Sequence, residues 1–254
     1  MRRLVTAVAL LPLITYVVLW GTNWLFLLLV TAVSLLCFYE YSGIVAAHGI
    51  QLPGPVGYAA GLVVLFVPRN ELLVVTLLAL IALLLALRAD PLPKGLPQAA
   101  ALLAGVIYIF GTLRCAISLR AIGPYWLFFA LGVNWIGDTA AYYVGRAAGR
   151  HKMATRLSPA KSWEGAVASL TASAAFGVLF LRWLMPEVAP PMAVLLSASG
   201  NVAGQIGDLV ESALKRGAGV KDSGNLLPGH GGWLDRLDGT LFSLPVVYGL
   251  LTLI

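Results

Sequence analysis

The chain has 254 residues, of which 59% are hydrophobic and only 11% are charged. Soluble domains carry roughly 25% charged residues, so this composition excludes an ordinary soluble globular protein. The formal net charge is +6, which basic loops beside anionic lipid explain without a nucleic-acid partner. The composition predicts an all-α polytopic membrane protein.

Apolar segments follow one another from the first residues to the last. A helix needs about 20 apolar residues to cross a bilayer. The first segment begins with basic residues but has no small-residue cleavage site after it, so we interpret it as a span that is retained. Breaking the chain at Pro, Gly and charged clusters predicts about nine spans, within a range of eight to ten: 4–20, 23–46, 54–68, 71–88, 99–119, 124–144, 165–185, 192–214 and 239–254.

The basic residues predict the orientation of these spans. With nine spans and a cytoplasmic N-terminus, most of the 17 Lys and Arg residues lie on the cytoplasmic side, as the positive-inside rule requires. Loops 145–164 and 215–238 then both face the cytoplasm. We interpret residues 1–120 (spans 1–5) as a scaffold that faces lipid or a second subunit. Residues 121–254 (spans 6–9 and the two loops) form the predicted catalytic region, with a polar cavity that faces the cytoplasm.

The sixth span contains unexpected polar residues. Asn134, Asp138 and Tyr142 are spaced four apart and share one helix face. An Asp within a span costs roughly 2.5–3.5 kcal/mol on insertion scales, so it usually faces a cavity or a partner. A structural pair between Asp138 and a Lys or Arg remains an alternative, and the basic residues of 146–152 also suit membrane anchoring.

The segment LSPAKSWEG, residues 157–165, combines helix-start signals with a cation. Ser158 and Pro159 predict a turn, and Ser162 suits the N-cap of the helix that follows. Glu164 in the first helical turn is favoured by the helix dipole. Lys161 is interpreted as a free cation beside a helix start, where backbone N–H groups can help it hold a phosphate.

Acids and a lysine interrupt the eighth span at its end, in GQIGDLVESALKR, residues 204–216. Asp208, Ser212 or Glu211, and Lys215 lie along one helix stripe. A salt bridge between Glu211 and Lys215, four residues apart, is the structural alternative. That pair leaves Asp208 unexplained, so Asp208 is a candidate for the site.

The stretch KDSGNLLPGHGGWLDRLDG, residues 221–239, is the most polar part of the chain. Glycines around His230 permit backbone conformations that aim several N–H groups at one anion. Asp235 and Asp238 are three residues apart and offer the oxygen ligands that Mg²⁺ prefers. Acids for a cation and basic residues with glycines for phosphates together indicate phosphoryl or nucleotidyl transfer at a membrane surface.

The polar blocks also resemble a known family. SALKRGAGVKDSGNLLPGHGGWLDRLDG, residues 212–239, is similar to the signature of the phosphatidate cytidylyltransferases, and DTAAYYVGR, SPAKSWEG and GDLVESALKR resemble upstream blocks in the expected order. The resemblance covers about residues 130–245. Trp233 replaces an aliphatic residue, and Ala160 stands where a Lys is common, which removes one basic contact.

The resemblance implies transfer of a cytidylyl group from CTP to phosphatidic acid, giving CDP-diacylglycerol and pyrophosphate. It also implies Mg²⁺ dependence with two metal ions, the second of which need not be magnesium. A homodimer with the site facing the cytoplasm is expected from the same likeness, and the size and compactness of the chain suggest a bacterial inner membrane. Membrane lipid is a further partner, and nucleic acid is not. Two alternatives remain at this point: CTP-dependent transfer to another lipid acceptor, and an ion-coupled transporter.

The resemblance assigns roles to residues as follows. Asp208 and Asp235 are the expected metal ligands, with Asp238 and Asp138 next in line. The expected catalytic residues are Asp208, Asp235, Asp238, Lys221 and Arg236. The expected substrate-binding residues are Asn134, Asp138, Ser158, Lys161, Glu164, Ser212, Lys215, Arg216, Asp222, Gly229, His230, Gly231 and Gly232.

Overall fold

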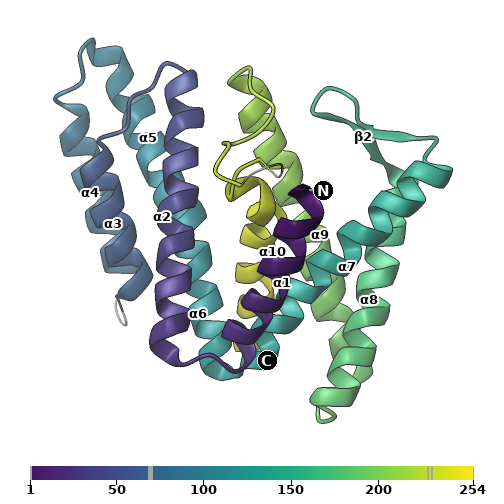
Figure 1. Cartoon of the computed structure of the whole chain (residues 1–254). Coiled ribbons are helices and arrows are strands. Elements are labelled where there is room, and N and C mark those ends of the chain that lie inside the picture. The colour runs from purple at the N-terminus through teal and green to yellow at the C-terminus, as the bar shows by residue number, and fades with distance from the viewer. Residues whose placement is uncertain (1, 68–70, 228, 230, 254) are drawn as a thin grey trace. The chain divides into compact units, whose positions relative to one another are not determined.

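The computed structural model describes residues 2–67, 71–227, 229 and 231–253. This part of the chain is almost entirely helical (Figure 1). The helices are α1 (Arg2–Leu19), α2 (Asn23–Ala47), α3 (Gly54–Phe66), α4 (Glu71–Ala86), α5 (Gly95–Gly105), α6 (Thr112–Ile122), α7 (Pro124–Ala148), α8 (Trp163–Leu184), α9 (Pro190–Gly217) and α10 (Leu234–Leu253). A 3-10 turn at Leu92–Lys94 precedes α5, and a π-helical segment at Val106–Gly111 joins α5 to α6.

The helices follow the apolar segments of the sequence. Each predicted span coincides with one helix, except that the fifth lies within the run from Leu92 to Ile122. Among the described residues, the segments Asn23–Ala47, Leu92–Ile122 and Trp163–Leu184 are long and apolar enough to cross a membrane, and Gly54–Phe66 and Leu72–Ala86 are shorter apolar helices. The all-α membrane class is therefore supported, while the count of nine spans stays a prediction.

The chain divides into two compact units, each assembled from separate segments. The first contains Met1–Pro12, Thr22–Ile117 and Leu214–Arg236. The second contains Leu13–Gly21, Ser118–Ala213 and Leu237–Ile254. Most of α9 belongs to the second unit, whereas its last residues and the start of α10 belong to the first.

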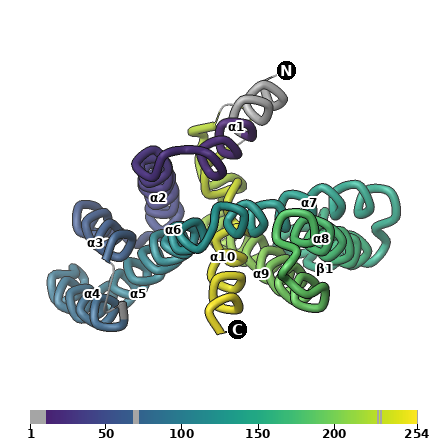
Figure 2. Tube along the Cα trace, turned by 90° about the horizontal axis from the view of Figure 1, so that it is seen from below, coloured from purple at the N-terminus to yellow at the C-terminus, as the bar shows by residue number. Residues whose placement is uncertain are grey.

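The first unit is built on close helix packing around aromatic rings. Helices α3, α4 and α5 lie side by side (Figure 2). A Cβ on Gly57 would lie 2.6 Å from the ring of Phe38, and one on Gly61 would overlap the ring of Phe110. The rings of Phe38 and Phe110 are 5.5 Å apart. Glycine on α3 therefore permits these rings to fill the core of the unit.

In the second unit, α7 and α8 pack along their length, with α9 joined to α8 by a buried polar seam (Figure 2). Asn201 on α9 donates hydrogen bonds to the Oγ atoms of Ser169 and Ser173 on α8, both at 2.9 Å. Ser173 in turn donates to the carbonyl of Val133 on α7, at 2.7 Å. Buried polar groups need such partners, so these bonds fix the register of the three helices.

The loop between α7 and α8 is not helical. It forms an antiparallel hairpin of β1 (Lys152–Ala154) and β2 (Ser158–Ser162). The predicted turn at Ser158 and Pro159 is wrong, because the turn occupies residues 155–157 and both residues lie in β2. Proline is tolerated there because each strand of a two-stranded sheet is an edge strand, where one N–H needs no partner.

Candidate active site

Three helices of the second unit cross at glycines. A Cβ on Gly207 of α9 would lie 2.5 Å from the backbone carbonyl of Asp238 on α10, and one on Gly239 would lie 3.1 Å from the carbonyl of Gly204. A Cβ on Gly204 would overlap Oδ1 of Asn134 on α7. Small residues permit backbones to approach closely in membrane proteins. The crossing places Asp208 beside Asp238 of α10.

Carboxylates gather at this crossing together with a lysine. Asp208 and Glu211 are the acidic neighbours of Asp238. The Nζ of Lys161 lies 2.6 Å from Oδ2 of Asp208, so the prediction that Lys161 is a free cation is wrong. The hydroxyl of Ser212 donates to Oδ1 of Asp208 at 3.4 Å. The ammonium group of Lys161 therefore partly neutralises the negative charge of this carboxylate cluster.

A cavity of about 640 Å³ opens beside this cluster, within the second unit. It combines acids, bases and small apolar residues, so it suits a ligand that carries both charge and hydrocarbon. The guanidinium of Arg146 donates to the hydroxyl of Tyr142 at 3.1 Å. The cavity is lined by Asp138, Ala141, Tyr142, Gly145, Arg146, Gly149, Lys152, Met153, Ala160, Lys161, Ser162, Gly165, Ala166, Ser169, Gln205 and Asp208.

Three other predicted residues of the second unit have structural partners. Asn134 is buried, and its amide donates to the carbonyl of Ala130 at 2.9 Å. Ser162 is the N-cap of α8, as predicted, and accepts from the N–H of Gly165 at 3.2 Å. Glu164 accepts from the backbone N–H of His151 at 3.2 Å and lies 2.6 Å from its Nδ1. Glu164 thereby ties the start of α8 to the hairpin.

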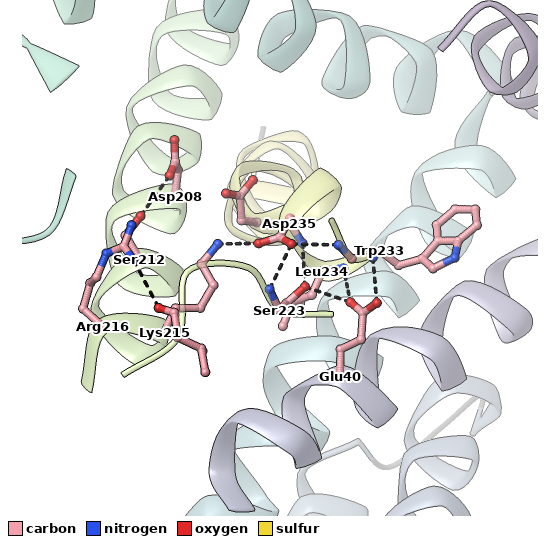
Figure 3. Close-up of polar contacts among 12 residues, drawn as sticks. Glu40, Asp208, Ser212, Lys215, Arg216, Ser223, Trp233, Leu234 and Asp235 are labelled. Atoms are coloured by element: carbon pink, nitrogen blue, oxygen red, sulfur yellow. Dashed lines mark hydrogen bonds and ion pairs between the residues drawn. The ribbon is translucent and has the colours of Figure 1, made fainter. Parts of the chain in front are cut away.

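The first unit holds a second polar cluster, centred on Asp235 (Figure 3). Its Oδ1 pairs with Lys215, and the two side chains are 6% and 10% exposed. Its Oδ2 accepts the N–H of Ser223 at 2.9 Å and of Gly232 at 2.8 Å. Burial acts to raise the pKa of the Asp235 carboxyl, but the lysine and the N–H donors outweigh it and lower the pKa below its usual value. Asp235 is therefore ionised at neutral pH.

The glycine-rich stretch folds around the protein's own carboxylates. Gly229 and Gly231 have φ of +79° and +78°, the left-handed region that glycine adopts without strain. A Cβ on Gly231 would lie 2.6 Å from Oδ2 of Asp235. The N–H of Gly232 donates to Asp235, and the assignment of the glycine run to a substrate phosphate stays a prediction. His230 lies outside the described residues.

Glu40 of α2 is part of the same cluster, and sequence reasoning did not single it out. Its carboxylate accepts the N–H groups of Trp233 at 3.0 Å and Leu234 at 2.8 Å, and the hydroxyl of Ser223 at 2.9 Å (Figure 3). A signal was available, because Glu40 is the only charged residue of the predicted span 23–46. The reasoning that selected Asp138, an acid within a span, applies to it equally.

Comparison with known proteins places the chain in a family. The model of the cytidylyltransferase family matches residues 1–254. The chain belongs to the cytidylyltransferase family. Relatives named phosphatidate cytidylyltransferase include one from Brucella suis biovar 1 (strain 1330), 35% identical over 97% of this chain and 91% of the relative. Another, from Bacillus subtilis (strain 168), is 37% identical over 69% of this chain and 68% of the relative.

Membership of the cytidylyltransferase family confirms the resemblance seen in the sequence and makes the protein a nucleotidyltransferase. It decides against the transporter alternative. Among the described residues, no group of three or more His, Cys, Asp and Glu side chains is arranged to hold a metal ion unaided.

The remaining residues that the sequence analysis assigned to the site lie at the surface, either in the hairpin or between the end of α9 and the start of α10. Ser158 is half-buried in β2. Arg216 is exposed, and its guanidinium donates to the carbonyl of Val220 at 3.2 Å. Lys221, Asp222 and Arg236 are exposed. Their roles in substrate binding stay predictions, because an exposed side chain is accessible to a ligand but does not identify that ligand.

Proposed function

We propose that the protein transfers the cytidylyl group of CTP to phosphatidic acid, forming CDP-diacylglycerol and releasing pyrophosphate. The printed name of relatives that align over nearly the whole chain supports this assignment. The observation that carries it is the cavity in which Lys152, Lys161 and Arg146 accompany small apolar residues. Such a lining matches a lipid phosphate, which combines an anionic head with hydrocarbon.

The reaction needs positioning and charge neutralisation more than proton transfer. An oxygen of the phosphatidic acid phosphate attacks the α-phosphorus of CTP, and a new P–O bond forms. The bond from that phosphorus to the oxygen bridging to the β-phosphate breaks, and pyrophosphate leaves. Because the nucleophile is already an anion, its alignment and the neutralisation of like charges dominate. Lys161 and Arg146 are assigned to the lipid phosphate, and Lys221 and Arg236 to CTP.

Mg²⁺ is the cofactor that this donor set fits. Asp208 and Asp235 each hold a lysine ammonium group, so both carboxylates lie where a cation is stabilised. Carboxylate oxygens are the hard ligands that Mg²⁺ prefers. We assign Asp208 and Asp235 to two metal ions, the second of which need not be magnesium, with Asp238 and Asp138 as further ligands. Bound Mg²⁺ would supply charge stabilisation for the attacking and leaving oxygens.

A membrane location is supported by apolar side chains on the surface. Trp183 on α8 is 90% exposed and Leu72 on α4 is 82% exposed, and they are two of many large apolar side chains that are exposed, which indicates an apolar surrounding. The proposal places the chain as a multi-pass protein of a bacterial inner membrane. The site faces the cytoplasm, where CTP is present, and the protein acts as a homodimer.

The proposed orientation predicts the location of fused reporters. A reporter fused after Arg216 is expected in the cytoplasm, and one fused after Leu184, between α8 and α9, is expected outside. The measurement is the activity of a pair of reporters, one active only inside the membrane and the other only outside. A signal from outside for the Arg216 fusion would contradict the orientation.

The lipid acceptor is tested by competition. Purified protein is supplied with labelled CTP and equal amounts of phosphatidic acid and a polyprenyl phosphate, and the lipid products are separated. We expect CDP-diacylglycerol as the dominant product. A cytidylylated polyprenyl product in its place would keep the chemistry and overturn the acceptor.

A further inference from the structure

Glu40 is a buried carboxylate in the half of the chain that carries few polar residues. Only 2% of it is exposed. Its three hydrogen bonds reach residues 183 to 194 positions later in the chain. A buried charge is tolerated only when it is paired or fully hydrogen-bonded. These donors are therefore the reason that a carboxylate is stable at this position of α2.

The bonds to Trp233 and Leu234 act on the start of α10. The first N–H groups of a helix lack partners within the helix, and a carboxylate at that end is favoured by the helix dipole. N-caps normally come from the preceding residues of the same segment. Here α2 supplies the carboxylate, so the position of α10's first turn depends on α2.

Ser223 links Glu40 to Asp235. Its hydroxyl donates to Oε2 of Glu40 at 2.9 Å and accepts the N–H of Asp235 at 3.3 Å. Its backbone N–H donates to Oδ2 of Asp235 at 2.9 Å (Figure 3). One residue thus contacts both carboxylates, and a displacement of Glu40 is transmitted to Asp235 through it.

The surrounding backbone is shaped to admit the Glu40 side chain. A Cβ on Gly232 would lie 2.5 Å from Cδ of Glu40, and one on Gly224 would lie 2.8 Å from its Oε1. Glycine is therefore needed at positions 224 and 232 to leave room for the Glu40 carboxylate. These two glycines are part of the high glycine content of residues 221–239.

The end of α2 also contacts the end of α9, which precedes the polar segment. His48 lies two turns after Glu40, and its Nε2 is 3.1 Å from the carbonyl oxygen of Leu214 near the end of α9. A Cβ on Gly217 would lie 2.7 Å from Cε1 of His48. Glu40 lies within α2, and His48 is the C-cap residue of this helix, eight positions later. The C-terminal half of α2 and its cap therefore contact residues at the end of α9 and at the start of α10.

We propose that Glu40 is a positioning residue, which fixes Asp235 and the start of α10 through Ser223. This inference rests on the proposed function, because it assumes that Asp235 acts in turnover. Glu40 itself touches no reacting atom in this account. Its role is to hold the polar segment of residues 221–238 in one conformation.

The test compares Glu40→Gln, Ser223→Ala and the double variant with Ser34→Ala. Glutamine keeps the size of the side chain but replaces one acceptor oxygen with a donor that faces other donors. Ser34 is the control, because it is fully buried on α2 and its hydroxyl donates within the same helix, to the carbonyl of Val30 at 2.7 Å. Turnover, KM for CTP and the unfolding temperature are measured for each protein in detergent.

Glu40→Gln is expected to lower kcat by about 10- to 100-fold, because small misplacements of reacting groups cost about that much. KM for CTP should stay close to the wild type, whereas the unfolding temperature should fall, because buried N–H donors lose an acceptor. The double variant should be no slower than the slower single variant, because residues in one network are not additive. A kcat of Glu40→Gln within about twofold of the wild type would overturn the proposal, and so would effects that multiply.

Hydrogen exchange separates this proposal from the proposed function. In Glu40→Gln, the backbone amides of Trp233 and Leu234 should exchange faster, while those of α3 and α5 stay unchanged. Ser34→Ala should leave Trp233 and Leu234 at the wild-type rate. If the wild type releases no pyrophosphate, the proposed function fails, yet faster exchange would still support the anchoring role. Unchanged exchange in Glu40→Gln would overturn that role whatever the activity.

Discussion

Asp235→Asn is expected to lower kcat by about a thousandfold, equivalent to about 4 kcal/mol of transition-state stabilisation. Asparagine keeps an oxygen that can accept the N–H groups of Ser223 and Gly232. It removes the negative charge that pairs with Lys215 and that is assigned to a metal ion. Turnover is therefore expected to fall because the side chain loses its negative charge, while its size and shape stay almost the same. The measurement is pyrophosphate release at saturating substrates.

The matched control for this prediction is Glu187→Gln. Glu187 is an exposed acid in the loop between α8 and α9, and it belongs to neither polar cluster. Its neutralisation should leave turnover unchanged. Thermal unfolding of both variants establishes that they are folded. A folded Asp235→Asn protein with near-normal turnover would contradict the role assigned to Asp235.

Gly207→Ala is expected to destabilise the protein by about 1–3 kcal/mol, which is typical of overpacking. The new Cβ would lie 2.5 Å from the backbone carbonyl of Asp238. A backbone atom cannot rotate away as a side chain can, so α9 and α10 must separate locally. Asp208 and Asp238 move with their helices, so turnover should fall as well. Thermal unfolding and turnover in detergent check both effects.

Gly249→Ala is the control for that substitution. Gly249 lies on α10, and a Cβ there would have nothing within 4 Å. Alanine in a helix interior is favoured over glycine by about 0.5–1 kcal/mol, so this variant should be as stable as the wild type or slightly more so. Equal behaviour of Gly207→Ala and Gly249→Ala would show that the close crossing of α9 and α10 is not needed.

The helices were predictable because each is an apolar run bounded by Gly, Pro or charge. The cap at Ser162 was predictable for a local reason as well, since an N-cap bonds to a residue three positions later. The hairpin of residues 152–162 was missed. Its strands of three and five residues carry no alternation of apolar and polar side chains, so the pattern that indicates a strand is absent.

Pairings between distant residues were the least predictable part of the site. The sequence suggested that Lys161 is free, but its partner Asp208 lies 47 positions later on another helix. The glycine run at 229–232 was assigned to a phosphate, whereas the N–H of Gly232 donates to Asp235 and those of the next two residues donate to Glu40. Composition indicated that the segment binds anions. It did not indicate that the anions include two carboxylates of the protein itself.

The most direct test of the account is pyrophosphate release by the purified protein in detergent, with Mg²⁺, CTP and phosphatidic acid together and with each omitted in turn. The account predicts release that requires all three and that is lost in Asp235→Asn. A folded wild-type protein that releases no pyrophosphate from CTP with phosphatidic acid would contradict it.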